Sequence, residues 1–247
     1  MLVLDRSGSM DGTKIENAKD GANTLIGGDA NASNDPDTGG LDPTVNAGLI
    51  SFGGDVTLDQ GLTTNHSAVE SAIESLSSGG LTPMAEAINR AQQELDANGD
   101  STTPSYMVLL ANGGADDNDN TRDAARNARN VSDLNNDGDA TTIISIAYGG
   151  NPDENLMEDL SSPPKVDNDS TDSEIITDED ENAFVAATDD ISGVFEDIGS
   201  IISGTYTIEY ETANCETNGN DRTVKVYVDD PDEGDADDTG SYTAPSS

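Results

Sequence analysis

The strongest constraint on the fold of this chain is the alternation of short, mostly apolar segments with amphipathic ones. The apolar segments are LVL, TVNAGLISF, SYMVLLA and TTIISIAY, at residues 2–4, 44–52, 105–111 and 141–148. Between them, apolar residues recur at helical spacing over residues 13–26, 67–76, 83–95 and 120–134. Strands that are apolar at successive positions are typical of a parallel sheet covered on both faces. The pattern therefore predicts an α/β fold with a doubly wound, mostly parallel sheet flanked by helices.

The pattern changes after residue 203, at the end of a last amphipathic helix predicted over residues 189–203. The segments TYTIEYET (205–212) and RTVKVYV (222–228) alternate polar and apolar residues, which is typical of half-exposed antiparallel strands. The acidic segment DDPDEGDADDTGS (229–241) is predicted to be a loop that precedes one more short strand. We therefore predict two parts: an α/β domain over residues 1–203 and a small C-terminal antiparallel β annex over residues 204–247.

Charge excludes some classes of partner. The chain has 50 acidic and 10 basic residues, for a formal net charge of -40. Phosphate groups are bound by clustered Lys and Arg, so nucleic acid and anionic membrane surfaces are not expected partners. Acidic residues spread along the whole chain favour adaptation to high salt, with a calcium-rich exterior or a solubilising surface as alternatives.

The sequence contains no membrane segment and no disulfide framework. Cys215 is the single cysteine, so it has no partner within the chain. No run of 18 apolar residues is present, and no direct membrane insertion is expected in this segment. Because residue 1 already lies inside a predicted strand, we expect the chain to be a fragment of a longer protein.

Polar side chains with oxygen atoms follow the predicted strands. Asp5, Ser7 and Ser9 come directly after the first strand, Thr82 lies in the loop GGLTP, and Asn112 follows SYMVLLA. In a doubly wound fold, ligands bind beyond the carboxyl ends of the strands. Hydroxyl, carboxylate and amide oxygens without His or Cys suit Mg²⁺, Mn²⁺ or Ca²⁺, not zinc. Each residue alone also suits a turn or a helix cap, so the prediction depends on their joint occurrence.

The motifs LVLDRSGSM, GGLTP and VLLANGG, in this order, resemble the von Willebrand factor type A domain over about residues 1–203. The resemblance implies a Rossmann-like fold with a metal-ion-dependent adhesion site. In that site Ser7 and Ser9 would bind the metal directly, Asp5 partly through water, and Thr82 directly or through water. Asn112 departs from the family pattern, which has aspartate there; it can still hold a metal-bound water but lacks the charge. Asp116 or Asp117 is expected to compensate.

The resemblance also implies a function. We expect a divalent-cation-dependent protein-binding or adhesion module that uses Mg²⁺, or Mn²⁺ or Ca²⁺, with an Asp or Glu of the protein partner completing the metal shell. It would belong to a larger cell-surface or secreted protein of a salt-adapted organism, with the cytoplasm as the alternative location. Engagement would be linked to movement of the helix 189–203. The alternative is an assembly subunit of a surface filament or layer with a structural or vestigial metal site.

Two other acidic segments have alternating oxygen-bearing side chains. DLNNDGDATT offers Asp133, Asn135, Asp137 and Asp139, but Ile144 stands where a helix–loop–helix calcium site needs Glu. ELDANGDSTT repeats the pattern at residues 96, 98 and 100. A solvated acidic turn is the preferred interpretation of both, and a structural Ca²⁺ site is the alternative.

Catalysis is not expected. His66 is the single histidine, at a predicted helix start, and there is one cysteine. Ser-His-Asp and Cys-His arrangements therefore lack the residues they need. No glycine-rich phosphate loop with its lysine follows a strand. A metal-dependent hydrolase remains as the enzyme alternative, which would require turnover of an ester or phosphate.

Overall fold

The computed structural model describes residues 1–27, 40–100, 103–112, 114–129, 141–149, 152–162, 183–186, 191–203, 221–228 and 236–243. These residues belong to two compact units, Met1–Thr205 and Tyr206–Ser247, and each is described by itself.

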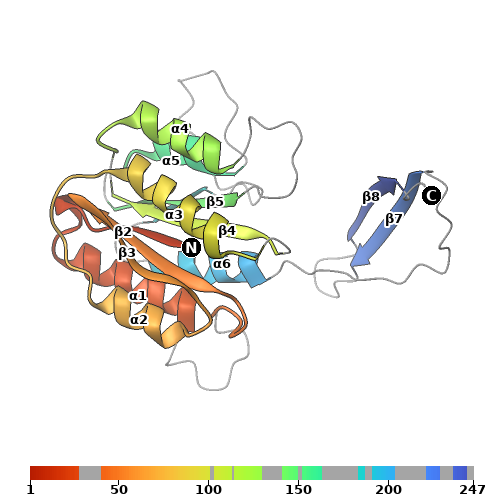
Figure 1. Ribbon diagram of the computed structural model, residues 1–247, viewed down its shortest axis with the longest axis horizontal. Helices are drawn as coiled ribbons and strands as arrows, with labels where there is room; N and C mark the ends of the chain where they lie inside the picture. Colours follow the sequence, from red (N-terminus) through yellow and green to blue (C-terminus); the bar gives the residue numbers. More distant parts are fainter. Residues whose placement is uncertain are drawn as a thin grey trace. The chain divides into compact units, whose positions relative to one another are not determined.

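Strands and helices alternate along the first unit (Figure 1). In chain order they are β1 (Leu2–Asp5), the short 3-10 helix η1 (Gly8–Met10), α1 (Thr13–Gly27), β2 (Ala47–Gly53), β3 (Asp55–Thr63), α2 (His66–Glu74), α3 (Met84–Asn98), β4 (Ser105–Ala111), α4 (Asn118–Ala128), β5 (Thr141–Tyr148), α5 (Glu154–Leu160), β6 (Ala183–Ala186) and α6 (Ile191–Ser203).

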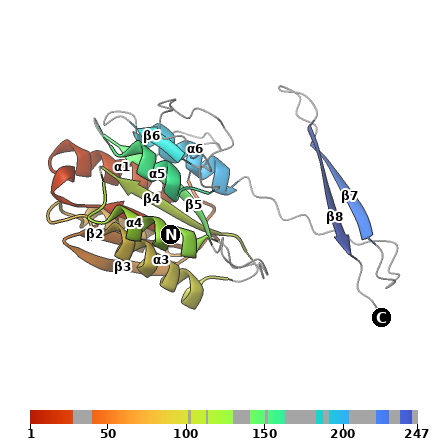
Figure 2. The same ribbon diagram turned by 90° about the horizontal axis from the view of Figure 1, so that it is seen from above.

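The strands form one six-stranded sheet in the order β3-β2-β1-β4-β5-β6. Every neighbouring pair is parallel except β2 and β3, which pair antiparallel. β1 lies between β2 and β4, so the strand order reverses there, and Figure 2 shows β4, β5 and β6 continuing the sheet on one side. The doubly wound, mostly parallel sheet is therefore confirmed, and its switch point lies at the carboxyl ends of β1 and β4.

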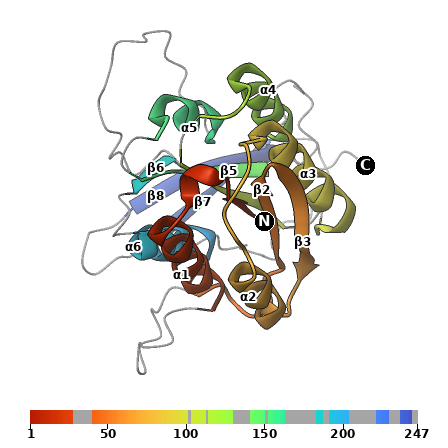
Figure 3. The ribbon, with the colours of Figure 1, turned by 90° about the vertical axis from the view of Figure 1, so that its left-hand side faces the viewer.

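Helices cover both faces of this sheet. Successive residues of a strand point to opposite faces and therefore pack in two different hydrophobic cores. Leu2 and Leu4 pack with α1, α2 and α6, whereas Val3 packs with α3, α4 and α5. Figure 3 shows these two sets of helices on opposite sides of the strands. Strands buried on both faces are apolar at most successive positions, which is why they are mostly apolar runs in the sequence.

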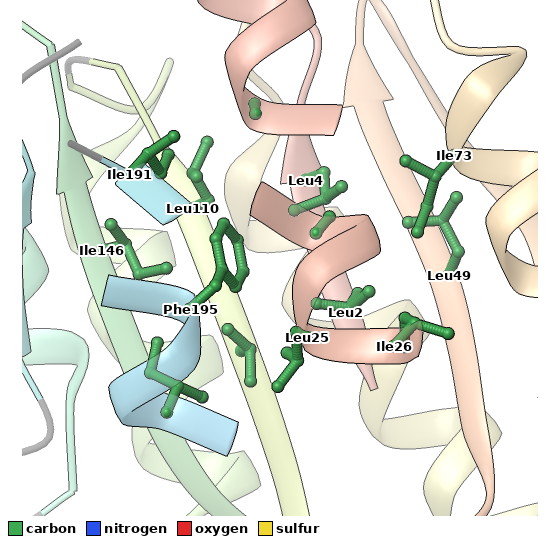
Figure 4. Close-up of a cluster of buried hydrophobic side chains, with 14 of the residues drawn as sticks. Leu2, Leu4, Leu25, Ile26, Leu49, Ile73, Leu110, Ile146, Ile191 and Phe195 are labelled. Carbon is green, nitrogen blue, oxygen red and sulfur yellow. The ribbon is translucent and has the colours of Figure 1, made fainter. Parts of the chain in front are cut away.

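The packing of α6 on α1 is close. Figure 4 shows Phe195 of α6 among Leu110, Ile146, Leu25 and other side chains of the first core. The Phe195 side chain is fully buried, and a Cβ built on Gly21 of α1 would lie 2.5 Å from its Cδ2 atom. The two helices approach this closely because Gly21 has no side chain.

The second unit contains an antiparallel pair, β7 (Asp221–Val228) and β8 (Ala236–Thr243), whose register runs from Asp221 opposite Thr243 to Val228 opposite Ala236. β7 lies where the sequence predicts a strand. The predicted loop over 229–241 is wrong in its second half, because β8 begins at Ala236 despite two aspartates in its first three residues. The strand predicted over 205–212 lies outside the described residues.

Two local predictions also need correction. The helix predicted to begin at residue 83 begins at Met84, with Pro83 as its N-cap, and no side chain caps this helix start. The helix continues to Asn98, so Asp96 and Asn98 are helical and only Asp100 lies in the following turn.

Candidate metal site

The candidate site is built where β1 and β4 end side by side. Asp5 is the last residue of β1, and Asn112 directly follows β4. The backbone N–H of Asn112 donates to Oδ2 of Asp5 at 3.1 Å. Two of the predicted ligand residues, 107 positions apart in sequence, are thus in direct contact.

The Asp5 carboxylate is buried and held by backbone donors. The N–H of Ser7 donates to its Oδ1 at 2.7 Å, so Ser7 and Asn112 engage one oxygen each. Burial raises the pKa of Asp5 above its ordinary value, and the hydrogen bonds from Ser7 and Asn112 oppose that rise. A cation near this carboxylate would therefore relieve the cost of burying its charge.

The two serine hydroxyls converge. Oγ of Ser7 and Oγ of Ser9 are 2.9 Å apart, with the Ser7 side chain buried and Ser9 exposed to solvent. Oxygen ligands at about 2.1 Å from a Mg²⁺ ion in octahedral geometry are about 3 Å apart along an edge of the octahedron. The spacing of the serine hydroxyls is thus compatible with two adjacent metal ligands.

The threonine loop is attached to the serine loop through the backbone. The N–H of Gly8 donates to the carbonyl of Gly80 at 3.0 Å, and the N–H of Gly79 donates to the carbonyl of Arg6 at 2.7 Å. Gly80 has φ +88°, and a Cβ on it would lie 2.5 Å from the Gly53 carbonyl oxygen. Only glycine fits this approach, which brings Thr82, two residues further on, to the same edge of the sheet.

A second carboxylate lies next to Thr82. Oδ1 of Asp116 accepts from the N–H of Thr82 at 3.2 Å, and the N–H of Asp116 donates back to the Thr82 carbonyl at 3.1 Å. Asp116 is exposed, whereas Asp117 caps α4 by accepting from the N–H of Asn120. Of the two residues considered as compensation for Asn112, Asp116 is the one joined to the threonine loop.

Lys14 also belongs to this region, and sequence reasoning missed it. Its ammonium donates to the Ser9 carbonyl at 2.9 Å and to Oδ1 of Asn112 at 3.1 Å. The Asn112 amide nitrogen donates to the Tyr148 carbonyl at 2.5 Å. The signal in the sequence was a lysine one helical turn after the serine motif, in a chain with few cations, but nothing local indicated its partner 98 residues away.

These residues fit a hard divalent cation. The structure brings together Asp5, Ser7, Ser9 and Asn112 by direct hydrogen bonds, and Thr82 through its loop. Over the described ranges, no group of three or more His, Cys, Asp or Glu gathers in a metal-binding arrangement. A cation here would therefore be held mainly by neutral oxygen atoms, with Asp5 as the one charged ligand.

The secondary candidates contribute little. Asp133, Asn135, Asp137 and Asp139 lie outside the described residues. The Asp96 carboxylate accepts from the side chain of Gln92 on its own helix, and the main-chain carbonyl of Asp100 accepts from the Thr103 hydroxyl, so both residues have local partners. His66 begins α2, and its Nε2 pairs with the Val45 carbonyl at 2.9 Å. Among the described helices, none is long and apolar enough to cross a membrane.

Comparison with known sequences identifies residues 1–115 as matching the family model of the von Willebrand factor type A domain. A UPF0353 protein of Mycobacterium ulcerans (strain Agy99) is 32% identical over 119 residues, which are 46% of this chain and 33% of that protein. The chain thus spans about a third of the length of this curated relative.

Solved structures share the fold. The von Willebrand factor type A protein from Catenulispora acidiphila superposes with a TM-score of 0.58 at 15% identity, covering 98% of this chain and 54% of that one. Manganese-loaded Plasmodium vivax TRAP gives 0.59 at 14% identity, covering 100% and 93%. Mussel byssus proximal thread matrix protein 1, with a zinc-occupied MIDAS motif, gives 0.57 at 13% identity, covering 91% and 48%.

Proposed function

We propose that this chain, whose first unit is a von Willebrand factor type A domain, is a protein-binding module that recognises an acidic side chain of its partner through a divalent cation. The observation that carries the proposal is the convergence of Asp5, Ser7 and Ser9 with Asn112 at the switch point of the sheet. Manganese-loaded TRAP and the zinc-occupied byssus protein have the same fold, which supports a divalent metal at this edge.

In the proposed site each residue has a separate task. Ser7 and Ser9 would present hydroxyl oxygens, Asp5 and Asn112 would hold metal-bound waters, and Thr82 would approach from its own loop. A bound Mg²⁺, Mn²⁺ or Ca²⁺ would supply an electrophile with an open coordination position for a carboxylate. With Asp5 as the only charged residue among these ligands, the charge of the ion is left largely unneutralised, which favours an Asp or Glu from the partner.

The surface around the site is suited to contact with a partner protein. Leu81, next to Thr82, is 69% exposed, the highest exposure among the large apolar side chains of the described residues. An apolar side chain beside a charged contact is common at the centre of protein interfaces. The net charge of -40 would repel an acidic partner at low salt, but molar salt reduces the range of that repulsion to about 3 Å. Attraction at the metal would then dominate at contact distance.

The module would be part of a larger cell-surface or secreted protein of a salt-adapted organism, and we propose no catalytic activity for it.

Thermal unfolding tests the metal. The protein is unfolded in high KCl after treatment with EDTA and then with Mg²⁺, Mn²⁺ or Ca²⁺ at constant ionic strength. Saturation at 100 times the dissociation constant should stabilise the fold by about 2.7 kcal/mol. Ser9→Ala removes an exposed ligand with little cost to folding and should abolish the shift. Ser71→Ala, which removes an exposed hydroxyl from α2, is the matched control and should keep it.

Peptide selection tests the partner. Random displayed peptides are selected on the wild-type protein in Mg²⁺ and tested against EDTA and against Ser9→Ala. The proposal requires an enrichment of Asp or Glu and loss of binding under both conditions. If no cation stabilises the fold, the alternative of an assembly subunit with a vestigial metal site becomes the better interpretation.

A further inference from the structure

The ammonium group of Lys14 bridges the two sides of the candidate metal site. Lys14 is the second residue of α1, directly after the serine loop. Its Nζ donates to the Ser9 carbonyl at 2.9 Å and to Oδ1 of Asn112 at 3.1 Å. One acceptor follows β1 and the other follows β4, so a positive charge already joins the two strand ends from which the metal ligands come.

The position of Lys14 is fixed by its neighbours. The Tyr148 hydroxyl donates to the Lys14 carbonyl at 3.2 Å, and the Tyr148 carbonyl accepts from the Asn112 amide nitrogen. The contact with Tyr148 directs the amide nitrogen of Asn112 away from Lys14, so Oδ1, the side-chain acceptor of Asn112, faces the ammonium group. Gly149 provides the space: a Cβ on it would lie 2.0 Å from Nδ2 of Asn112 and 3.7 Å from Cε of Lys14.

Asparagine at position 112 leaves this site with less negative charge than a site that has aspartate there. With asparagine at position 112, Asp5 and Lys14 contribute one negative and one positive charge. The charges of Asp5 and Lys14 cancel, so a divalent cation entering beside Asp5 would meet a nearby ammonium group and an Asn112 oxygen that already has a hydrogen-bond donor.

We propose that Lys14 is a built-in competitor of the divalent cation. In the metal-free protein its ammonium group takes the oxygen of Asn112 and balances the charge of Asp5. Metal binding then requires that a metal-bound water share the Asn112 oxygen with Lys14 or replace it there, and that the ion tolerate the charge of Lys14. Lys14 therefore sets the affinity of the site for its cation. The inference rests on the proposed function in one respect, that the cation binds at Asp5, Ser7 and Ser9.

The test is direct binding of Mn²⁺, followed by the electron paramagnetic resonance signal of the free ion at constant high KCl. Lys14→Met removes the charge and keeps the length of the side chain. We expect Mn²⁺ to bind this variant about tenfold more tightly, because a unit charge is removed from beside a divalent ion in a largely aqueous dielectric. Lys14→Arg keeps the charge and should keep the wild-type affinity within about threefold.

Lys19→Met is the matched control. It removes the same charge from the same helix, where Lys19 pairs with Glu16 at 3.3 Å instead of with a site residue. This variant should bind Mn²⁺ like the wild type. Circular dichroism of each variant in EDTA establishes that it is folded, and Lys14→Arg provides the second variant if Lys14→Met unfolds: a Lys14→Arg affinity that differs by tenfold or more would then overturn the proposal.

The outcomes separate this inference from the proposed function. Tighter binding by Lys14→Met, but not by Lys19→Met, supports the inference. Equal or weaker binding by Lys14→Met, with binding by the wild type intact, overturns the inference and leaves the proposed function standing. Binding by Lys14→Met alone supports competition by Lys14 and overturns metal dependence in the wild type. Binding by neither overturns both.

Discussion

Asn112 and Gly149 fit against each other only because Gly149 has no side chain. A Cβ atom on Gly149 would lie 2.0 Å from Nδ2 of Asn112, and Gly149 has φ +100°. We predict that Gly149→Ala lowers the free energy of unfolding by more than 2 kcal/mol, since it adds a steric clash to a backbone strain of about 1–2 kcal/mol. Urea unfolding in high KCl measures the change.

Gly12→Ala is the control for that prediction. Gly12 also has a positive φ, of 80°, but a Cβ on it would meet no atom within 4 Å. Gly12→Ala should lower the free energy of unfolding only by the backbone strain of about 1–2 kcal/mol. Equal losses in the two variants would mean that Asn112 moves away from Gly149 at no cost, and would contradict a fixed Asn112.

Ligand binding is expected to reach α6 through α1. α1 follows the serine loop directly, and Gly21 of α1 receives the ring of Phe195. We predict that Mg²⁺ together with a selected acidic peptide increases hydrogen exchange in α6, while exchange in α3, on the opposite face of the sheet, stays unchanged. Mass spectrometry of the exchanged peptides provides the measurement. Unchanged exchange over residues 191–203 with the peptide bound would exclude this coupling.

Asp59 on β3 should make stability depend on pH. Burial raises the pKa of its carboxyl group, opposed by hydrogen bonds from Ser51 and by the charge of Arg6. A pKa that is higher in the folded state means that ionised Asp59 costs stability. That cost is absent below the unfolded pKa of about 3.9 and grows as the pH rises through the folded value.

We therefore predict that Asp59→Asn is more stable than the wild type at pH 7, and that the difference shrinks toward pH 4. Urea unfolding between pH 4 and pH 7.5 measures both proteins. Asp55→Asn removes the same charge from an exposed position of the same strand and should not reproduce the pH-dependent difference. A difference that stays constant with pH would rule out Asp59 as its source.

The net charge of -40 should make the fold depend on salt. The Debye length falls from about 10 Å at 0.1 M salt to about 3 Å at 1 M, which screens most repulsion between surface carboxylates. We predict that the Tm rises steadily between 0.1 M and 2 M KCl, with EDTA present to remove divalent ions. Sucrose at matched osmolality is the control. A flat or falling Tm in KCl would contradict adaptation to high salt.

The central strands of the sheet were predictable because their own sequences are mostly apolar. SYMVLLA corresponds to β4 residue for residue, and its last five residues are buried, which is why the apolar run marks the strand. β8 was not predicted as it stands, because its start, ADD, is acidic and typical of a loop. There the pairing with β7 outweighs local preference.

The juxtaposition of the candidate ligands was predictable from the sequence, but the positive charge of Lys14 beside them was not. Asp5, Ser7 and Ser9 are close in sequence, and the doubly wound topology accounts for Asn112 beside them. The contact between Lys14 and Asn112 spans 98 residues and depends on the absence of a side chain at Gly149. Nothing in the local sequence of any of these three residues indicates the other two.

Because β1 lies between β2 and β4, the candidate cation site is complete only after both of these strands have been synthesised. A nascent chain that ends before residue 105 can pair β1 with β2 and already contains Asp5, Ser7, Ser9 and Thr82, yet the neighbour that supplies the Asn112 N–H to Asp5 has not been synthesised. Until β4 is added, the Asp5 carboxylate lies at an open sheet edge in water. The contact between Asn112 and Asp5 would thus form only when β4 has joined the sheet beside β1, so that cation binding would report this step of folding.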